Sequence, residues 1–207
     1  MFSDLYAIKN QDLPVLAEKL GRAFEGDPIC RYVFPEEEPR RQRARHFYEL
    51  VMRVSFRRGW VFAPSEELEG AACWLPPHRE HPGAWQYFLA GALITMLRTG
   101  PGAMARIESI GKILDERHRK FAPEPHYYLA CLGTAPEHRG RGFAGKLVRP
   151  MLELCDREGM PLYLETHNAA NPPLYERFGF KTMDESPIPE TDMTQWSMLR
   201  PPRGKNS

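Results

Sequence analysis

Hydrophobic positions near the N-terminus follow a strand pattern first and helical patterns afterwards. A short apolar run over residues 5–8 predicts a strand, and the apolar residues after it recur every three or four positions, which predicts a helix. That helical set is Leu13, Leu16, Ala17, Leu20 and Phe24. We expect the helix to begin near Asp12, as its N-cap, and to end before Pro28. A second helix is predicted from about Pro39.

The middle of the chain predicts a hairpin followed by a long helical segment. Residues 60–63 and 70–75 are apolar runs separated by a polar turn, which is typical of two antiparallel strands. Helical patterns follow over residues 84–99 and 101–121, split by Gly100-Pro101. We therefore expect a helical insertion between the third and fourth strands.

Strands and helices alternate in the C-terminal part. We predict strands over residues 127–134, 162–166 and 195–199, with helices over 142–158 and 173–178 between them. A strand, a helix and a strand in succession favour an α/β arrangement with some parallel pairing.

Composition and charge restrict the class of protein. The length of 207 residues fits one domain, which we place at residues 1–202, with a disordered tail at 203–207. A net charge of +1 argues against nucleic acid held by general electrostatic attraction. No apolar stretch reaches the roughly 20 residues of a membrane span, and the N-terminus lacks a signal-peptide pattern. We therefore expect a cytoplasmic protein with no nucleic-acid or membrane partner.

No arrangement of residues predicts a metal site. The four cysteines are widely separated and form no C-x-x-C pair. His78 and His81 are three residues apart in a proline-rich loop and lack further ligands nearby, so we expect both to be solvated.

A glycine-rich run between a predicted strand and a predicted helix carries the first chemical signal. It reads Arg139-Gly140-Arg141-Gly142-Phe143-Ala144-Gly145. Glycines let the backbone turn sharply and approach a ligand, and the first N–H groups of a helix are unpaired at the positive end of its dipole. A pyrophosphate is the natural occupant of such a site, although a simple connecting turn has the same composition.

Two other phosphate-binding loops fit this run less well. The Walker motif requires Gly-Lys-Ser/Thr, whereas Lys146 is followed by Leu147. The dinucleotide pattern G-x-G-x-x-G matches Gly140, Gly142 and Gly145, but that motif belongs at the start of a larger sheet than the remaining chain can form. A dehydrogenase is therefore the weaker interpretation.

Two motifs together resemble the GCN5-related N-acetyltransferase (GNAT) superfamily. Arg139-x-x-Gly142-x-Ala144 matches its R/Q-x-x-G-x-G/A loop signature. In residues 168–180, an asparagine is followed after six residues by Tyr-Glu-Arg-Phe-Gly-Phe, which is similar to its N-x(6)-Y-E-K/R-x-G-F element. Both motifs have the expected spacing across one strand-helix-strand-helix unit, so the chain is identified as a member of this superfamily.

The C-terminal part is similar in particular to the puromycin N-acetyltransferase-like branch, through residues 171–180 and the closing Trp-Ser-Met at 196–198. The resemblance implies an α/β (α+β) GNAT fold, with a mixed central sheet of about six or seven strands flanked by helices. It also implies a metal-independent enzyme that transfers the acetyl group of acetyl-CoA to a primary amine by direct attack in a ternary complex.

The same resemblance implies where acetyl-CoA binds. Family members hold the CoA pyrophosphate on loop amides, which here belong to Arg139, Gly140, Arg141, Gly142, Phe143, Ala144 and Gly145. Both arginine side chains are expected to be free to add charge. Leu132, Gly133 and Thr134 are expected to contact pantetheine through the main chain, with an N–H near Leu132 or Gly133 polarising the thioester carbonyl. Asn168 or Asn171 is expected to hydrogen-bond CoA, and the family patterns leave that choice open.

Tyr175 is implied to be the acid that protonates the departing CoA thiolate. The alternative is a tyrosine that only packs the short helix onto the sheet. Glu165, at the end of the fifth strand, is the candidate base or substrate anchor, with His167 or a water chain as alternatives. Cys131 lies on the strand that faces the thioester, but an acyl-enzyme is not expected because the family attacks directly.

The acceptor side is less determined by the sequence. Candidates for its lining are Phe24, Asp27, Tyr32, Trp74 and Tyr87. The alternative for the Trp and Tyr residues is a place in the core. The helical insertion is expected to form a lid or a homodimer surface. An enclosed aromatic pocket would favour a small-molecule amine, which is the preferred acceptor, and an open acidic groove would favour a peptide. The alternatives are a protein or peptide N-acetyltransferase and a non-catalytic CoA sensor.

Overall fold

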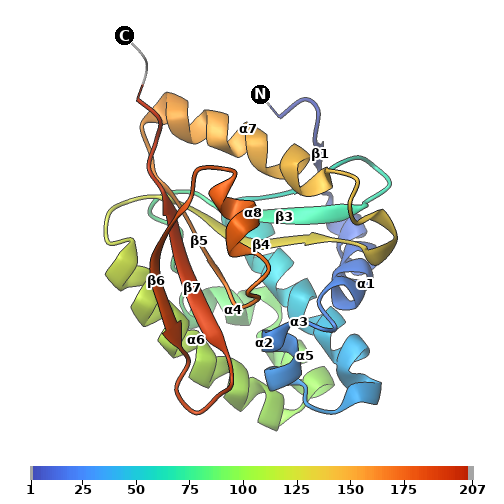
Figure 1. The fold of residues 1–207 in the computed structure, drawn as a ribbon. Helices are drawn as coiled ribbons and strands as arrows, with labels where there is room; N and C mark the ends of the chain where they lie inside the picture. The colour runs from blue at the N-terminus through green and yellow to red at the C-terminus, as the bar shows by residue number, and fades with distance from the viewer. Residues whose placement is uncertain (1, 205–207) are drawn as a thin grey trace.

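Seven strands form one mixed sheet in a computed structural model that describes residues 2–204. Their order across the sheet is β1-β2-β3-β4-β5-β7-β6 (Figure 1). The strands are β1 Tyr6–Ala7, β2 Trp60–Ala63, β3 Gly70–Leu75, β4 Tyr127–Thr134, β5 Leu162–Thr166, β6 Lys181–Pro187 and β7 Thr194–Arg200. Neighbouring strands are antiparallel except β4 and β5, which are parallel. The sheet and its flanking helices confirm the predicted fold class.

Helices cover both faces of the sheet (Figure 1). They are α1 Leu13–Ala23, α2 Pro28–Val33, α3 Glu37–Arg58, α4 Ala84–Ala90, α5 Ala92–Thr99, α6 Pro101–Phe121, α7 Phe143–Glu158 and α8 Pro172–Glu176. The helices α4, α5 and α6 lie between β3 and β4 in the chain, which confirms the predicted helical insertion. Among the helices of residues 2–204, none combines the length and the apolar character needed to cross a bilayer.

Each face of the sheet has its own hydrophobic core. Leu147 and Met151 of α7 pack with Trp74 of β3 on one face. Leu20 of α1 and Met52 of α3 belong to the cluster on the other face. These five side chains are all fully buried, and burial of a side chain of this size contributes about 1.5–3 kcal/mol. The two cores therefore fix α7 opposite α1 and α3, with the sheet between them.

Two elements differ from the sequence-based prediction because their signals were weak. The strand β6 was not predicted, since it is an edge strand that pairs only with β7 and exposes most of its side chains, so it lacks alternating apolar positions. The helix predicted over 84–99 is divided into α4 and α5 at Gly91, whose φ of 105° is in the left-handed region.

Two aspartates near helix starts behave differently from each other. Asp27 accepts a hydrogen bond from the Ile29 N–H at 3.0 Å and so caps the unpredicted helix α2. Asp12 precedes α1 but does not cap it, because its carboxylate accepts the Lys9 N–H at 2.8 Å and the Tyr6 hydroxyl at 3.0 Å. Asp12 therefore occupies the predicted N-cap position, but its side chain makes no capping hydrogen bond to α1.

The end of β7 is tied to α7 by a charged contact. Arg200 donates to both carboxylate oxygens of Asp156 at 2.7 Å, and the Arg203 N–H donates to the same carboxylate at 2.7 Å. The Arg200 guanidinium holds the pKa of Asp156 below its usual value. Of the tail predicted at 203–207, Arg203 and Gly204 have no regular secondary structure, and 205–207 lie outside the described residues.

Candidate active site

The site lies where β4 and β5 separate. The two strands pair only through the first two residues of each, Tyr127 with Leu162 and Tyr128 with Tyr163. Beyond those pairs the strands diverge (Figure 1), so this edge of β4 has no strand partner along the rest of its length. The register between β3 and β4 skips Ala130, which is a bulge in the same region. An extended ligand can use the free main-chain groups at such an edge.

A groove of about 930 Å³ runs from the end of β4 along α7 to α8. Seven of the predicted cofactor-binding residues line it: Thr134, Arg139, Gly140, Gly142, Phe143, Ala144 and Gly145. Sequence reasoning missed the basic residues around them, which are Lys146, Arg149, Arg177, Arg200 and Arg203. The first two could have been found, because positions 142, 146 and 149 share one face of a helix. Glu153 and Asp156 also line the groove, and Asp156 pairs with Arg200, but positive side chains outnumber negative ones.

Gly142 starts α7 in a conformation suited to anion binding. Its φ is 79°, and Gly140 has a φ of 76°, so both occupy the left-handed region that favours glycine. No side chain caps the start of α7, so the N–H groups of its first turn donate to no capping side chain. A Cβ at either glycine would meet no atom within 4 Å among the described residues. These amides therefore open on space that a phosphate can occupy.

The two loop arginines differ from the expectation that both would be free. Arg139 donates through Nη2 to the Ala23 carbonyl at 2.6 Å and thereby ties the loop to the end of α1. Arg141 lies 3.0 Å from His138 Nδ1, and its guanidinium is 5.3 Å from the centre of the Phe143 ring. Arg141 is not among the residues that line the groove.

Four predicted cofactor contacts lie beside the groove rather than on its wall. Leu132 is half-buried on the α7 face, and Gly133 faces the opposite way, because a Cβ there would be 2.6 Å from Phe24. Asn171 donates to the Thr166 hydroxyl at 2.8 Å and begins α8, whereas Asn168 is exposed and accepts the Ala170 N–H. Their contacts with CoA stay a prediction.

Tyr175 is buried in α8 below α7. Its ring packs edge-on against Phe180, with 5.8 Å between ring centres. Burial raises the pKa of its hydroxyl, and the nearby Cys131 and Asp27 raise it further. The hydroxyl therefore keeps its proton at neutral pH and is available as an acid.

Glu165 lies at the end of β5, on the opposite face from α7. It accepts a hydrogen bond from the Tyr128 hydroxyl at 2.5 Å, while its second oxygen, Oε2, is buried and has no hydrogen-bond partner among the described residues. Burial raises the pKa of Glu165 to about 7. The hydrogen bond from Tyr128 lowers this pKa, and the charge of Asp115 raises it by a smaller amount. A carboxyl group with this pKa is half ionised at neutral pH, as suits a general base.

Two alternative reactive groups are less suited to the chemistry. His167 is buried two residues after Glu165, and burial lowers its pKa to about 4, so it is neutral at pH 7. The Cys131 thiol shares a hydrogen bond with Cys73, and this contact and burial raise its pKa well above the usual value. A protonated thiol is a poor nucleophile, which agrees with the expectation that no acyl-enzyme forms.

The residues expected to line the acceptor side fall on two faces. Trp74 is fully buried in the core under α7, which agrees with the core alternative and excludes it from the acceptor side. Phe24 stacks on Tyr48 at 4.4 Å, and Tyr32 packs against α6, both on the face that carries Glu165. The pKa of Tyr87 on α4 is raised mainly by burial and secondly by the charge of Glu165, so the two side chains lie near each other.

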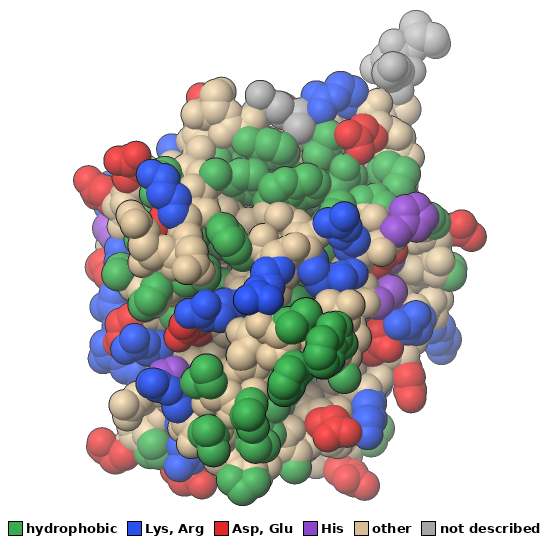
Figure 2. Space-filling view, turned by 180° about the vertical axis from the view of Figure 1, so that it is seen from behind, with side chains coloured by type: hydrophobic (Ala, Val, Ile, Leu, Met, Phe, Trp, Pro, Cys, Tyr) green, Lys and Arg blue, Asp and Glu red, His purple; other side chains and the backbone are tan. Residues whose placement is uncertain are grey.

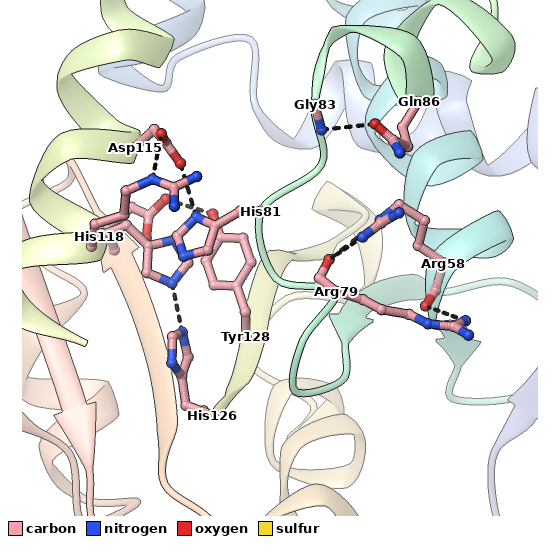
Figure 3. A network of polar contacts seen from close by, with 11 residues as sticks. Arg58, Arg79, His81, Gly83, Gln86, Asp115, His118, His126 and Tyr128 are labelled. Carbon is pink, nitrogen blue, oxygen red and sulfur yellow. Dashed lines mark hydrogen bonds and ion pairs between the residues drawn. The ribbon is translucent and has the colours of Figure 1, made fainter. Parts of the chain in front are cut away.

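His81 is not solvated as expected but belongs to a cluster of three histidines (Figure 3). Its Nδ1 lies 2.8 Å from Asp115, and its ring centre lies 4.4 Å from that of His118. His118 and His126 share a hydrogen bond at 2.7 Å between their Nε2 atoms. Burial lowers the pKa of His118 to about 2, so this ring is neutral. Among residues 2–204, no group of His, Cys, Asp and Glu is arranged to hold a metal ion.

The fold and the groove define a mixed α/β protein that presents a strand edge and a positively charged helix start to one extended ligand. The sequence profile of the Acetyltransferase (GNAT) family matches residues 53–180 of the 207. Because that match covers more than half of the chain, the chain belongs to this family.

Known proteins agree with this assignment. An uncharacterized N-acetyltransferase of Schizosaccharomyces pombe is 27% identical over 180 residues, which are 84% of this chain and 72% of the relative. A Corynebacterium glutamicum structure, described as histone acetyltransferase HPA2 and related acetyltransferase, has a TM-score of 0.67 at 20% identity over 98% of each chain. Arylalkylamine N-acetyltransferase 2 of Aedes aegypti has a TM-score of 0.62 at 16% identity over 96% of this chain and 98% of its own. At these identities the two structures support the fold alone.

Proposed function

We propose that the chain transfers the acetyl group of acetyl-CoA to a primary amine of a small molecule. The observation that carries this proposal is the position of two titratable groups beside the β4–β5 opening. Glu165 ends β5 and has an unsatisfied buried oxygen, and Tyr175 follows in α8 within electrostatic reach of Cys131 on β4. One group holds a proton at neutral pH and the other can accept one.

The groove fits a CoA ester. The open amides at the start of α7 suit its pyrophosphate, and the basic side chains of Lys146, Arg149 and Arg177 suit its negative charge. The free edge of β4 suits the amide groups of pantetheine. When bound, acetyl-CoA supplies the activated acetyl group.

Two side chains then move the protons of the reaction. The Glu165 carboxylate accepts the proton that the attacking amine loses, and its position beside a tyrosine hydroxyl keeps it oriented. The Tyr175 hydroxyl gives its proton to the departing sulfur, so the thiolate leaves as a thiol. Tyr175 regains a proton from solvent before the next turnover.

The surroundings of Glu165 support a small acceptor rather than a peptide. The rings of Tyr128 and Tyr163 lie on its sheet face, with His118 of α6 packed against both at 4.5 Å and 4.2 Å between ring centres. Tyr87 of α4 approaches from the helical insertion. These neighbours are aromatic, and aromatic rings beside one carboxylate suit an ammonium group through cation–π contact and charge. Membership of the puromycin N-acetyltransferase-like branch and a cytoplasmic location are parts of the same proposal.

Ligand-dependent melting tests the cofactor assignment. At a concentration of acetyl-CoA about 100 times its Kd, binding adds about 2.7 kcal/mol to the free energy of unfolding. For a chain of this size we expect the melting temperature to rise by roughly 5–10 °C. CoA is expected to give a similar rise and NADH none. No shift with acetyl-CoA, confirmed by calorimetry, would contradict the proposal; a shift justifies screening amines by thiol release.

The pH dependence of kcat/KM distinguishes the candidate bases. Since only the carboxylate form of Glu165 accepts a proton, kcat/KM is expected to fall about tenfold per pH unit below pH 7. Glu165→Gln should lower the rate and remove this acidic limb of the pH profile, whereas the profile of His167→Asn should keep the limb. A limb near pH 4 that disappears with His167→Asn would assign the base to His167 instead.

A further inference from the structure

The outer surface of α4 and α5 exposes a group of large hydrophobic side chains. This α4–α5 patch consists of Trp85, Phe88, Leu89, Leu93, Ile94 and Leu97, each between 46% and 75% exposed. The Trp85 and Phe88 rings stack with their centres 5.3 Å apart. Figure 2 shows hydrophobic side chains gathered on the lower half of this side of the molecule. Single exposed apolar residues are ordinary, whereas a gathered patch marks an interaction surface.

The helix α5 is polar inside and apolar outside. It buries Thr95 and Thr99, whose hydroxyls donate to helix carbonyls at 3.3 Å and 2.8 Å. Its exposed positions are the aliphatic residues of the patch and Arg98. A helix that packs on a core for stability alone has the opposite arrangement. The apolar side of α5 is therefore built to meet something outside the chain.

The charge within the segment that carries the patch has one sign. Residues 81–107 contain no Asp or Glu, although the chain as a whole has nearly balanced charge. Arg98 is exposed on α5, and Arg57 and Arg58 lie at the end of the neighbouring helix α3. Figure 2 shows a row of Lys and Arg side chains above the hydrophobic group. An occupant of this surface has to be apolar in part and negative in part.

A hollow of about 330 Å³ lies between α3 and α4 at the border of the patch. It is lined by Val54, Arg57, Arg58, Gln86 and Leu89. Two of these side chains are positive and two are apolar, so the hollow suits a phosphate group attached to a hydrocarbon chain.

The arginines at this hollow are not neutralised by carboxylates. Arg58 Nη2 donates to the Arg79 carbonyl at 3.2 Å, and Arg79 Nη1 donates to the Arg58 carbonyl at 3.4 Å (Figure 3). Among the described residues, no Asp or Glu lies within ion-pair distance of Arg57, Arg58 or Arg79. These backbone contacts tie the end of α3 to the loop after β3 and leave the charge of Arg58 for a ligand in the hollow.

We infer that the α4–α5 patch and the adjacent Arg57–Arg58 hollow dock the protein on an anionic phospholipid surface. Trp, Phe and Leu beside Arg are the composition of helices that lie in a membrane interface. Anionic headgroups attract arginines near the surface. A second copy of the chain is the poorer occupant, because a two-fold contact would bring the same positive rim against itself. The inference departs from the expectation of no membrane partner, and it is independent of acetyl transfer.

Vesicle flotation tests the inference with the full chain. We expect it to float with phosphatidylcholine vesicles that contain phosphatidylserine, at least about tenfold more than with phosphatidylcholine alone. Salt at about 1 M should abolish the difference by screening. Leu97→Glu and Arg57→Glu should each reduce flotation about tenfold or more. Met183→Glu is the matched control, because Met183 is 48% exposed on β6, away from the patch, and the change in charge is that of Leu97→Glu.

Light scattering on the same proteins separates the other outcomes. Docking on lipid is supported if the wild-type protein is a monomer that floats with the anionic vesicles, and if Leu97→Glu abolishes flotation while Met183→Glu keeps it. Absence of flotation with both vesicle types overturns the inference, as does equal loss with Met183→Glu. A wild-type dimer that Leu97→Glu converts to a monomer, without vesicle binding, assigns the patch to a homodimer interface and overturns the inference as well.

Discussion

Tyr175→Phe is expected to lower kcat by about 10²–10⁴-fold and to leave the Kd for acetyl-CoA nearly unchanged. The substitution removes only the hydroxyl that gives its proton to the departing thiolate. The ring that remains still packs against Phe180 in the core under α7, so the fold is kept. The hydroxyl lines no part of the charged groove that we assign to CoA, which is why binding survives.

The measurement combines thiol release at saturating substrates with calorimetric titration of acetyl-CoA. Tyr127→Phe is the matched control, because Tyr127 is also buried on the α7 side but donates its hydroxyl to Glu158 at 2.7 Å. That variant should keep the wild-type rate. A wild-type rate in Tyr175→Phe would remove Tyr175 from the mechanism. Equal losses of rate and cofactor binding would show that Tyr175 acts by packing.

Gly142→Asp is expected to weaken acetyl-CoA binding by about 2–4 kcal/mol, which raises the Kd roughly 30- to 1000-fold. The new carboxylate stands at the start of α7, where the open amides and the basic groove otherwise attract phosphate. The apo protein should still fold, since no described atom lies within 4 Å of the added Cβ and Asp tolerates left-handed backbone better than most residues.

Gly142→Asn separates charge from backbone strain in this experiment. Asn has the size of Asp and a similar tolerance of the φ of 79° at this position, but it carries no charge. We expect Asn to weaken binding much less than Asp in a titration at low salt, and high salt to narrow the gap. Equal effects of the two substitutions would mean that the position binds no phosphate.

The elements that were predicted best are those whose signal is contiguous in the chain. The bounds of β2, β3, β4 and β5 follow from apolar runs between turn residues, and those runs need no distant partner to be recognised. The glycine loop was equally clear, because a helix start in a left-handed conformation leaves few choices of residue. The edge strand β6 was missed because strands that face water on both sides carry no such pattern.

The surroundings of the proposed chemical groups could not be predicted in this way. Glu165 was singled out from its position near the end of β5, but its partner Tyr128 lies on another strand, and its pKa of about 7 comes from burial. The histidine cluster joins the loop after β3 to the end of α6 and the start of β4, so no local spacing reveals it. The Arg139 side chain was expected to be free, whereas its guanidinium donates to a carbonyl at the end of α1.

The sequence by itself determined the family, the order of all long elements except the edge strand β6, and the loop at the start of α7, because each of these depends on residues that are neighbours in the chain. The tertiary structure decided which way side chains face and what they meet. In a regular strand Leu129 and Cys131 would lie on the same face of the sheet. The bulge at Ala130 instead places Leu129 under α7 and Cys131 on the opposite face. Packing likewise turned the leucines of α5 outward and Trp74 away from the acceptor side. Both outcomes depend on contacts between segments far apart in the sequence, and these form only when the whole chain folds.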